Sequence, residues 1–411
     1  MVPKQLKIAM ISLHSCPLGK LGGKDTGGMN VYIRELAREL GRKGHVVDIY
    51  TRVHQPEHEK IVSLGQNVRL IHLEALDDEE MPKVALYAYL QGFTCDLENF
   101  RKSDSLRYDL IHSHYWLSSL AGKQLRVWWR IPHVAMFHTL GAVKNSIGIG
   151  ENEPELRVES ERDVIADCER IIATTEREKD ELTRYYDASP QKIAVVPCGV
   201  SMDIFKPVDK KLARTELGLD QQKLILFVGR IEPLKGLRQL LTALTLLTDG
   251  ETPGLAVVGG DEYSRGEVQT LQRLAGQLQI KDRVSFLGAV SQERLCLFYS
   301  AADICVIPSF YESFGMVALE SLACGTPVVT TDVGGMRYVI RHGGMGRVVR
   351  DNSPDRLASG IAQLLSGKGD RAQDVETRRT TIAEFSWDNI VDRVLSEYNK
   401  VLEKWSVRVS P

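Results

Sequence analysis

The sequence lacks three features that would each define a class of protein. No uninterrupted apolar segment approaches the roughly 20 residues that a bilayer span requires, so we expect no membrane span. The 52 Lys and Arg residues balance 54 Asp and Glu residues, which gives no reason to expect nucleic acid as a partner. The seven cysteines are scattered and include no CxxC pair. That usage favours reduced thiols in a cytoplasmic protein over a disulfide framework.

Short apolar runs alternate with helical patterns along almost the whole chain. The start, "MVPKQLKIAMISLHS", has the basic residues of a weak signal peptide, but its short apolar run followed by a helical pattern favours a first β-strand. Predicted strands begin near Lys7, Val46, Tyr108, His133 and Arg170 and, after a linker at 195–207, near Lys223, Gly254, Arg283, Asp303 and Thr326. Continuous runs of Val, Ile and Leu are typical of parallel strands covered by helices on both faces.

This rhythm predicts the α/β class, with two doubly wound, Rossmann-like parallel-sheet domains that face a cleft. We place the first domain at 1–197 and the second at 198–385. Residues 386–411 are predicted to form a helix that packs back toward the first domain and closes the fold.

Two loops that follow predicted strands contain residues suited to phosphate. "LGKLGGKDTGGMNVYIREL" contains Gly27 and Gly28 and opens a helix, although it fits neither GxGxxG nor the Walker pattern, and it could be only a structural turn. "FVGRIEPLKG" places Arg230 and Lys235 five positions apart. Two cations at a strand end can neutralise a diphosphate, whereas a solvated basic loop is the simpler interpretation.

The segment "ESFGMVALE" begins with Glu312 and ends with Glu320, with Gly315 allowing a tight entry into a helix. One glutamate could hydrogen-bond sugar hydroxyls and the other a ribose diol. Acidic residues also favour the first turn of a helix, which would explain Glu312 without any function. A pair of carboxylates for glycoside hydrolysis is a third interpretation, but it leaves Arg230 and Lys235 unexplained.

Histidines lie within one predicted strand and at the end of another. We expect His112 and His114 in "HSHYW" to point to opposite faces of their strand, and no acidic third ligand is evident, so no metal site is predicted. His138 in "FHTLGAVKN" ends its own strand and is the better functional candidate.

Taken together, these motifs resemble those of the GT4 family of retaining glycosyltransferases, which have the GT-B fold. The similarity covers nearly the whole chain, and "ESFGMVALE" is its most specific mark. "DTGGMNVYI", "YDLIHSHYWLS" and "HTLGAVKNS" are similar to the mycothiol-pathway branch, which transfers N-acetylglucosamine from its UDP form to inositol phosphate. Sucrose-phosphate synthases are the neighbouring comparison.

The resemblance implies a role for each matching residue. The donor diphosphate would be bound by Arg230 and Lys235 with the glycine loop, the ribose by Glu320 and the donor sugar by Glu312. His138 would lie beneath the reacting anomeric carbon. The backbone that cradles the sugar and phosphate would be that of Phe314, Gly315, Met316 and Val317. Positions that match the lining of the acceptor site are Asn30, Tyr115, Thr139, Lys144 and Arg157.

One position departs from the family pattern. The inositol-phosphate branch has a lysine where this chain has Asp78, and an anion facing a phosphate is unfavourable. Lys83 could replace that charge, or the acceptor could be another phosphate or a neutral sugar. The GGMN of the first loop also differs from the GGQ typical of sucrose-phosphate synthases.

The resemblance therefore implies a cytoplasmic retaining enzyme that uses UDP-N-acetylglucosamine or UDP-glucose by a same-face, SNi-like route. It implies no obligatory metal or other cofactor, small-molecule partners only, and a homodimer by family analogy. A sucrose-phosphate-synthase-like or sucrose-synthase-like transferase is the nearest alternative. A nucleotide-sugar epimerase, a phosphorylase with pyridoxal phosphate and a non-catalytic nucleotide-sugar binding protein are alternatives of other classes.

Overall fold

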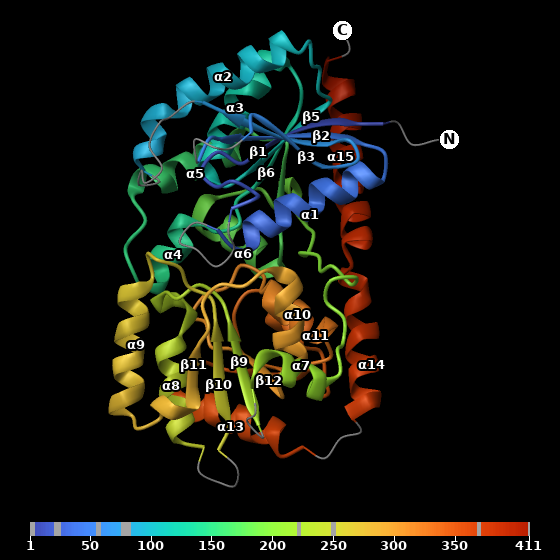
Figure 1. The fold of residues 1–411 in the computed structure, drawn as a ribbon. Coiled ribbons are helices and arrows are strands. Elements are labelled where there is room, and N and C mark those ends of the chain that lie inside the picture. Colours follow the sequence, from blue (N-terminus) through green and yellow to red (C-terminus); the bar gives the residue numbers. More distant parts are fainter. Residues whose placement is uncertain are drawn as a thin grey trace. The chain divides into compact units, whose positions relative to one another are not determined.

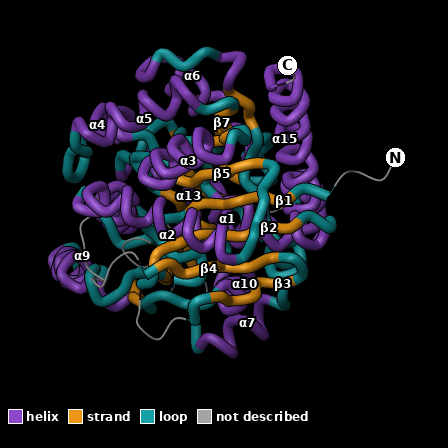
Figure 2. Tube along the Cα trace, turned by 90° about the horizontal axis from the view of Figure 1, so that it is seen from above, coloured by secondary structure: helices purple, strands orange, loops and turns teal. Residues whose placement is uncertain are grey.

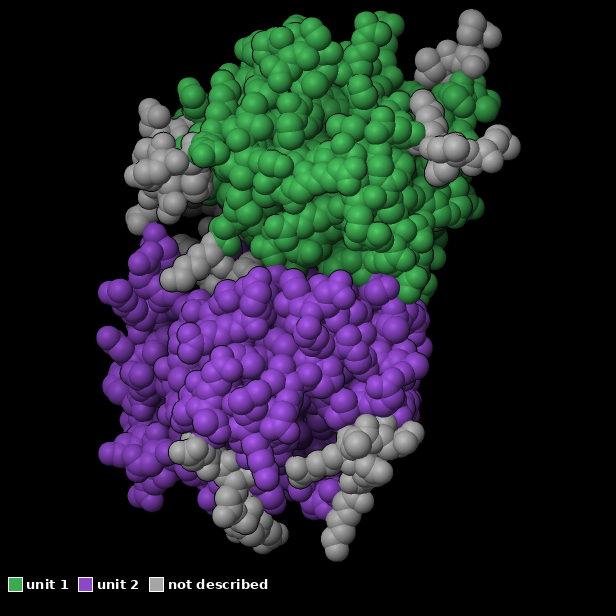
Figure 3. Space-filling view, turned by 45° about the vertical axis from the view of Figure 1, so that its right-hand side comes forward, with its two compact units in different colours: residues 1–19, 28–197, 387–411 green, residues 20–27, 198–386 purple. Residues whose placement is uncertain are grey.

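The computed structural model describes residues 5–19, 26–54, 59–74, 84–219, 223–247, 252–367 and 371–409. The chain divides into two compact units, coloured separately in Figure 3. Unit 1 consists of residues 1–19, 28–197 and 387–411, and unit 2 consists of residues 20–27 and 198–386. Unit 1 is thus built from segments at both ends of the chain.

Unit 1 is a sheet covered by helices. Its strands are β1 (Lys7–Ile11), β2 (Val46–Arg52), β3 (Ile61–Gly65), β4 (Val68–Leu73), β5 (Leu110–His114), β6 (His133–Met136), β7 (Arg170–Ala173) and β8 (Ile193–Val195). Their order is β3-β4-β2-β1-β5-β6-β7-β8 (Figure 2), and all neighbours are parallel except β3 and β4. The order reverses between β1 and β5, which makes this the switch point where doubly wound sheets bind ligands.

The helices of unit 1 cover both faces of that sheet. They are α1 (Gly28–Arg42), α2 (Leu90–Ser103), α3 (Trp116–Trp129), α4 (Gly141–Ile147), α5 (Glu155–Asp167), α6 (Glu176–Tyr186) and α15 (Trp387–Val409), with short 3-10 turns η1 (Ala85–Tyr89) and η2 (Pro190–Lys192). Because the chain reverses its winding at the switch point, α1 and α2 cover opposite faces. The α2 and α3 face has a core that includes Phe93, Leu97 and Leu125.

Helix α15 packs against α1 in unit 1, although it is encoded at the far end of the chain. Its buried residues recur at helical spacing, at Ile390, Val391, Val394, Tyr398 and Val401. The ring of Trp387, at its start, lies 5.4 Å from the ring of Tyr32 on α1. Figure 1 shows this helix at the red end of the colour scale.

Unit 2 contains the smaller of the two sheets. Its strands are β9 (Leu224–Val228), β10 (Gly254–Val258), β11 (Val284–Phe286), β12 (Ile304–Ile307), β13 (Val328–Thr331) and β14 (Gly346–Val349). Their order is β11-β10-β9-β12-β13-β14 and every pair is parallel. In chain order this is 3-2-1-4-5-6, the Rossmann order, with its switch point between β9 and β12.

The helices of unit 2 form two layers on that sheet. They are α7 (Lys210–Leu217), α8 (Leu237–Thr245), α9 (Arg265–Gln277), α10 (Gln292–Ala301), α11 (Met316–Ala323), α12 (Met336–Val339), α13 (Pro354–Leu365) and α14 (Arg371–Ile382), with 3-10 turns η3 (Pro233–Lys235), η4 (Lys281–Arg283) and η5 (Ala383–Phe385). Helices α8, α9 and α13 share one core with the sheet. Figure 1 shows α8 and α9 on one side of the strands and α10 and α11 on the other.

Two further observations concern the whole set of described residues. None of their helices combines the length and hydrophobicity needed to cross a bilayer. All seven cysteines are free thiols, and only Cys95 is not fully buried.

Candidate active site

In unit 2 the predicted donor residues meet at the switch point of the sheet. The loop after β9 and the loop after β12 contact each other, since the Phe310 N–H donates to the Leu234 carbonyl at 2.9 Å. Gly236 between η3 and α8 has φ +69, and an added Cβ would lie 2.0 Å from the Pro308 carbonyl oxygen. Only glycine permits that approach of the two loops.

Lys235 and Glu312 form an ion pair across these loops. The ammonium of Lys235 lies 2.7 Å from Oε1 of Glu312, and the Ser309 hydroxyl donates to the same oxygen at 2.8 Å. Each of the two charged side chains is less than a fifth exposed. Sequence patterns place the two residues in separate motifs, and the structure brings them together with Ser309, which the sequence reasoning missed.

Arg230 lies in the same loop as Lys235. Its guanidinium pairs with Glu232 at 2.9 Å, and an added Cβ on Gly27 would lie 3.9 Å from its Nε. Gly27 therefore lies beside Arg230 within unit 2, while Gly28 is the first residue of α1. The two cations and one glycine of the predicted diphosphate site are thus on adjoining parts of unit 2.

Gly315 makes the sharp entry into α11 that the sequence predicted. Its φ is +101, and an added Cβ would lie 2.1 Å from Cε of Met336. Phe314 before it is buried against Phe385, with ring centroids 6.2 Å apart. Because the first N–H groups of a helix have no acceptor within it, the start of α11, from Met316 onward, can bind an anion.

Glu320 lies further along α11 and is buried. Burial raises its pKa to about 7, although the Tyr299 hydroxyl donates to its Oε2 at 2.7 Å and partly offsets that rise. A carboxyl with such a pKa can take or release a proton near neutrality. Tyr299 comes from α10, and no spacing in the sequence links it to Glu320.

In unit 1 the corresponding edge of the sheet carries two strained residues. Tyr115 follows β5 with φ +76, and His138 follows β6 with φ +61. Neither is glycine, and such strained backbone concentrates at functional sites. The Tyr115 N–H donates to the Met136 carbonyl at 2.8 Å, which ties the ends of the two strands together.

The side chain of His138 joins a buried row of rings. Its Nε2 lies 3.0 Å from Nδ1 of His114, and Nδ1 of His112 lies 2.6 Å from the Tyr398 hydroxyl on α15. Burial lowers the pKa of His138 to about 3. These imidazoles are therefore neutral at physiological pH, and His138 is held by packing and hydrogen bonds rather than by charge.

The prediction that His112 and His114 point to opposite faces is wrong. Their ring centroids lie 4.2 Å apart, because residues two positions apart on a strand share a face. Even so, the described residues contain no group of three or more His, Cys, Asp or Glu arranged to bind a metal ion.

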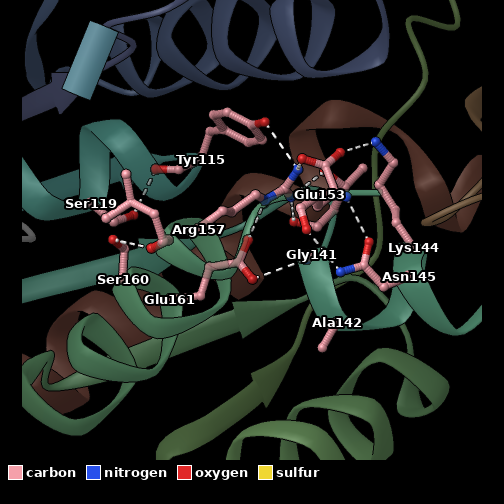
Figure 4. Close-up of polar contacts among 12 residues, drawn as sticks. Tyr115, Ser119, Gly141, Ala142, Lys144, Asn145, Glu153, Arg157, Ser160 and Glu161 are labelled. Carbon is pink, nitrogen blue, oxygen red and sulfur yellow. Dashed lines mark hydrogen bonds and ion pairs between the residues drawn. The ribbon is translucent and has the colours of Figure 1, made fainter. Parts of the chain in front are cut away.

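Arg157 lies at the centre of the predicted acceptor residues (Figure 4) and is almost fully buried. Its Nε donates to Glu161 at 2.7 Å and its Nη1 to the Tyr115 hydroxyl at 3.1 Å. Its Nη2 donates to the carbonyl and hydroxyl oxygens of Thr139, at 2.7 and 3.0 Å. Nη1 also lies 2.9 Å from Oε2 of Glu153. Lys144 contacts the same Glu153 carboxylate. Four of the predicted acceptor residues therefore form one cluster: Arg157, Tyr115, Thr139 and Lys144.

The structure describes only one of the two remaining acceptor predictions. Asn30 on α1 is buried and donates through Nδ2 to Ser15 Oγ at 2.7 Å and to the Cys16 carbonyl at 2.6 Å. It therefore fixes the loop after β1. Lys83, and Asp78 with it, lie outside the described residues.

Two family models match the chain in succession. "Glycosyltransferase Family 4" matches residues 26–204 and "Glycosyl transferases group 1" matches residues 209–381. A D-inositol 3-phosphate glycosyltransferase of Corynebacterium glutamicum is 36% identical over 98% of both chains. One of Mycobacteroides abscessus is 39% identical over 99% of this chain and 92% of its own. The sucrose-phosphate synthase of Thermosynechococcus elongatus superposes with TM-score 0.88 and 31% identity, covering 98% of this chain and all of its own.

The two Rossmann-like sheets, together with the superposition on the sucrose-phosphate synthase, show the GT-B fold of glycosyltransferases. With full-length relatives at this level of identity, the chain belongs to glycosyltransferase family 4. The predicted family, fold class and transferase activity are therefore confirmed.

Proposed function

We propose that the protein is a retaining glycosyltransferase that moves N-acetylglucosamine or glucose from its UDP form to a phosphorylated polyol or sugar. The observation that carries this proposal is the full-length similarity to proteins named D-inositol 3-phosphate glycosyltransferase. The similarity to a sucrose-phosphate synthase supports the same acceptor class, since that name too specifies a phosphorylated product. Because Asp78 stands where the inositol-phosphate branch has lysine, the proposal names the class of acceptor and not one compound.

On this proposal unit 2 binds the donor. Arg230 and Lys235 bind the diphosphate with the backbone of Gly27 and Gly28, and the start of α11 donates N–H groups to sugar and phosphate. Glu320 accepts hydrogen bonds from the ribose hydroxyls. Glu312, oriented by Lys235 and Ser309, accepts one from the donor sugar.

Unit 1 then binds the acceptor phosphate through Arg157, Tyr115, Thr139 and Lys144, with Lys83 as a further cation from outside the described residues. In the transfer step an acceptor hydroxyl attacks the anomeric carbon on the face that the diphosphate leaves. The bond from that carbon to the β-phosphate oxygen breaks, and the departing phosphate takes the hydroxyl proton. The backbone carbonyl of His138 stabilises the positive charge that develops on the sugar.

The proposal includes a cytoplasmic location, homodimer formation and no obligatory metal. Its test is a screen of UDP-, GDP- and ADP-sugars against inositol 3-phosphate, fructose 6-phosphate and their unphosphorylated forms, with released nucleotide as the readout. Transfer from UDP-sugars to phosphorylated acceptors only, with the donor's anomeric configuration kept in the product NMR spectrum, is expected. An inverted product contradicts retention, and conversion of the donor without nucleotide release favours an epimerase.

A sucrose-phosphate-synthase-like activity is the second candidate, and the TM-score of 0.88 favours it. It predicts that fructose 6-phosphate is the preferred acceptor in the same screen. A sucrose-synthase-like enzyme would instead use unphosphorylated fructose.

A further inference from the structure

Glu153 occupies a particular place among the acceptor residues of unit 1 (Figure 4). Its carboxylate lies between two cations, with Oε2 2.9 Å from Nη1 of Arg157 and Oε1 in contact with the ammonium of Lys144. These are the groups that the proposed function assigns to the acceptor phosphate. The Glu153 carboxylate thus occupies the hydrogen-bond donors of Arg157 and Lys144 that a bound phosphate would need.

A second carboxylate, Glu161, also pairs with Arg157 but is placed differently. It is fully buried, and besides Arg157 Nε it accepts from the Gly141 N–H at 2.9 Å and from the Tyr186 hydroxyl. Removing it would leave several buried donors without an acceptor, which is costly. Glu161 therefore fixes the position of the Arg157 guanidinium from its buried side.

Glu153 has more freedom. Its side chain is 17% exposed, and it lies before Pro154, outside helix α5. Asn145 holds its backbone on both sides: the Glu153 N–H donates to Asn145 Oδ1 at 2.7 Å, and Asn145 Nδ2 donates to the Glu153 carbonyl at 2.9 Å. Its carboxylate can consequently rotate away while its backbone stays fixed.

The charge of Glu153 is maintained by its two partners. Burial by itself would raise the pKa of this carboxyl, but the charges of Arg157 and Lys144 outweigh burial and lower the pKa below its ordinary value. At neutral pH the Glu153 carboxylate therefore carries a negative charge between the two cations, whereas burial raises the pKa of Glu161 above its ordinary value. When the Glu153 carboxylate leaves, the positive charges of Arg157 and Lys144 lose one counter-charge, beside the hydroxyl oxygens of Tyr115 and Thr139 that accept from Arg157.

We propose that Glu153 is a specificity-determining residue that stands in for the acceptor phosphate and is displaced when a phosphorylated acceptor binds. The inference rests on the proposed function, since it requires the acceptor phosphate to bind at Arg157 and Lys144. A ligand with a single negative charge would replace the single charge of the Glu153 carboxylate and bring no additional charge to the site. A phosphate dianion brings a second charge and three acceptor oxygens, so its binding gains electrostatic and hydrogen-bond energy that the binding of a monoanion does not.

The consequence is selection between anions. Glu153 keeps Arg157 and Lys144 oriented, and it excludes carboxylates and other monoanions from the site. Phosphate must overcome the same competitor, so the native residue lowers phosphate affinity while it raises selectivity.

The test compares Glu153→Gln with the native protein, since glutamine keeps the shape and removes the charge. With inorganic phosphate as the probe in a calorimetric titration, we expect binding to tighten by roughly tenfold or more, because one like charge has been removed from a partly screened site. Acetate, a monoanion, should inhibit transfer by the variant more than by the native enzyme. The matched control is Glu155→Gln, an exposed position on the first turn of α5 with the same change in charge.

The outcomes separate this inference from the proposed function. If Lys144→Gln weakens phosphate binding while Glu153→Gln leaves it unchanged or weaker, the phosphate site stands and the role of Glu153 is refuted. If neither variant changes phosphate binding, the acceptor site itself is misplaced. If Glu153→Gln unfolds, Glu153→Asp keeps the charge but shortens the side chain, and an intermediate gain in phosphate affinity is then required.

Discussion

Replacing Glu320 with glutamine should change how the stability of unit 2 depends on pH. Burial raises the pKa of this carboxyl from 4.5 to about 7 in the folded protein. Between those pH values the folded state keeps a proton that the unfolded state has lost. The free energy of unfolding therefore falls as pH rises through this window, because protons bound only by the folded state stabilise it at low pH. Glutamine has no such proton, so the variant should not show this fall.

The size of the effect follows from the shift. A difference of about 2.5 pKa units, at about 1.36 kcal/mol each, gives an upper value of about 3.4 kcal/mol at pH 8. Since about 1 kcal/mol moves the melting temperature of a domain of this size by roughly 2 to 4 °C, the variant should gain roughly 7 to 14 °C on the native protein. The gain should be small at pH 4.5 and complete above pH 7.

Differential scanning calorimetry at closely spaced pH values measures this difference. Other titrating groups are common to both proteins, so they cancel when the two curves are subtracted. Glu376→Gln, at an exposed position of α14, is the control for the loss of one carboxylate. Parallel curves for Glu320→Gln and the native protein would refute the argument, and so would a difference that grows on acidification.

The remaining predictions concern donor and acceptor binding. Lys235→Ala should lower kcat by about 10²- to 10³-fold, as loss of one donor to a developing anion does, with an unchanged circular dichroism spectrum; near-normal turnover would remove Lys235 from the diphosphate site. Gly315→Ala places a Cβ 2.1 Å from Cε of Met336 at φ +101, so it should raise the donor KM roughly tenfold or more, for a strain on the order of 1–3 kcal/mol. Adding Met336→Ala should recover part of that loss in the same kinetic assay. Asp78→Lys should improve kcat/KM for a phosphorylated polyol, and an unchanged acceptor profile would show that the phosphate does not reach that position.

Much of the fold could be predicted because buried parallel strands are written as continuous apolar runs. Each of the ten predicted runs overlaps a strand of the structure. Strands β3, β4, β8 and β14 were not predicted. β4 is interrupted by Arg69, whose guanidinium pairs with the buried Asp48 on β2 at 2.8 Å. β3 is a largely exposed edge strand, and β8 has only three residues. Polar pairing and short length hide such strands from an apolar pattern.

The site shows the same limit. Motifs identified Lys235 and Glu312, which lie in loops after strands, and Glu320, which lies eight positions after Glu312 on the following helix. Tyr299, the partner of Glu320, carries no such signal, since contact between α10 and α11 depends on how the helices pack. Ser309 lies only three residues before Glu312, so its contact with that carboxylate could have been found. Glu161 could have been found, because it lies four residues after Arg157 on one helix. The role of Glu153 could not have been found, since this residue lies in an irregular segment before Pro154. Its partner Lys144 lies nine residues earlier in the sequence, and its partner Arg157 lies four residues later.

The position of α15 has a consequence for the time at which this protein can mature. Its Tyr398 contacts His112 and its Trp387 contacts Tyr32, so this helix seals the face of unit 1 that leads to His138. A ribosome must make residues 198–386 before it reaches that helix, and at roughly 5–20 residues per second this takes about ten to forty seconds. During that interval the first half of the nascent chain exposes an unsealed apolar surface, whereas unit 2 emerges complete. Unit 1, most of which is encoded first, is thus completed last, and a chaperone that binds nascent chains would meet unit 1 rather than unit 2 in an incomplete state.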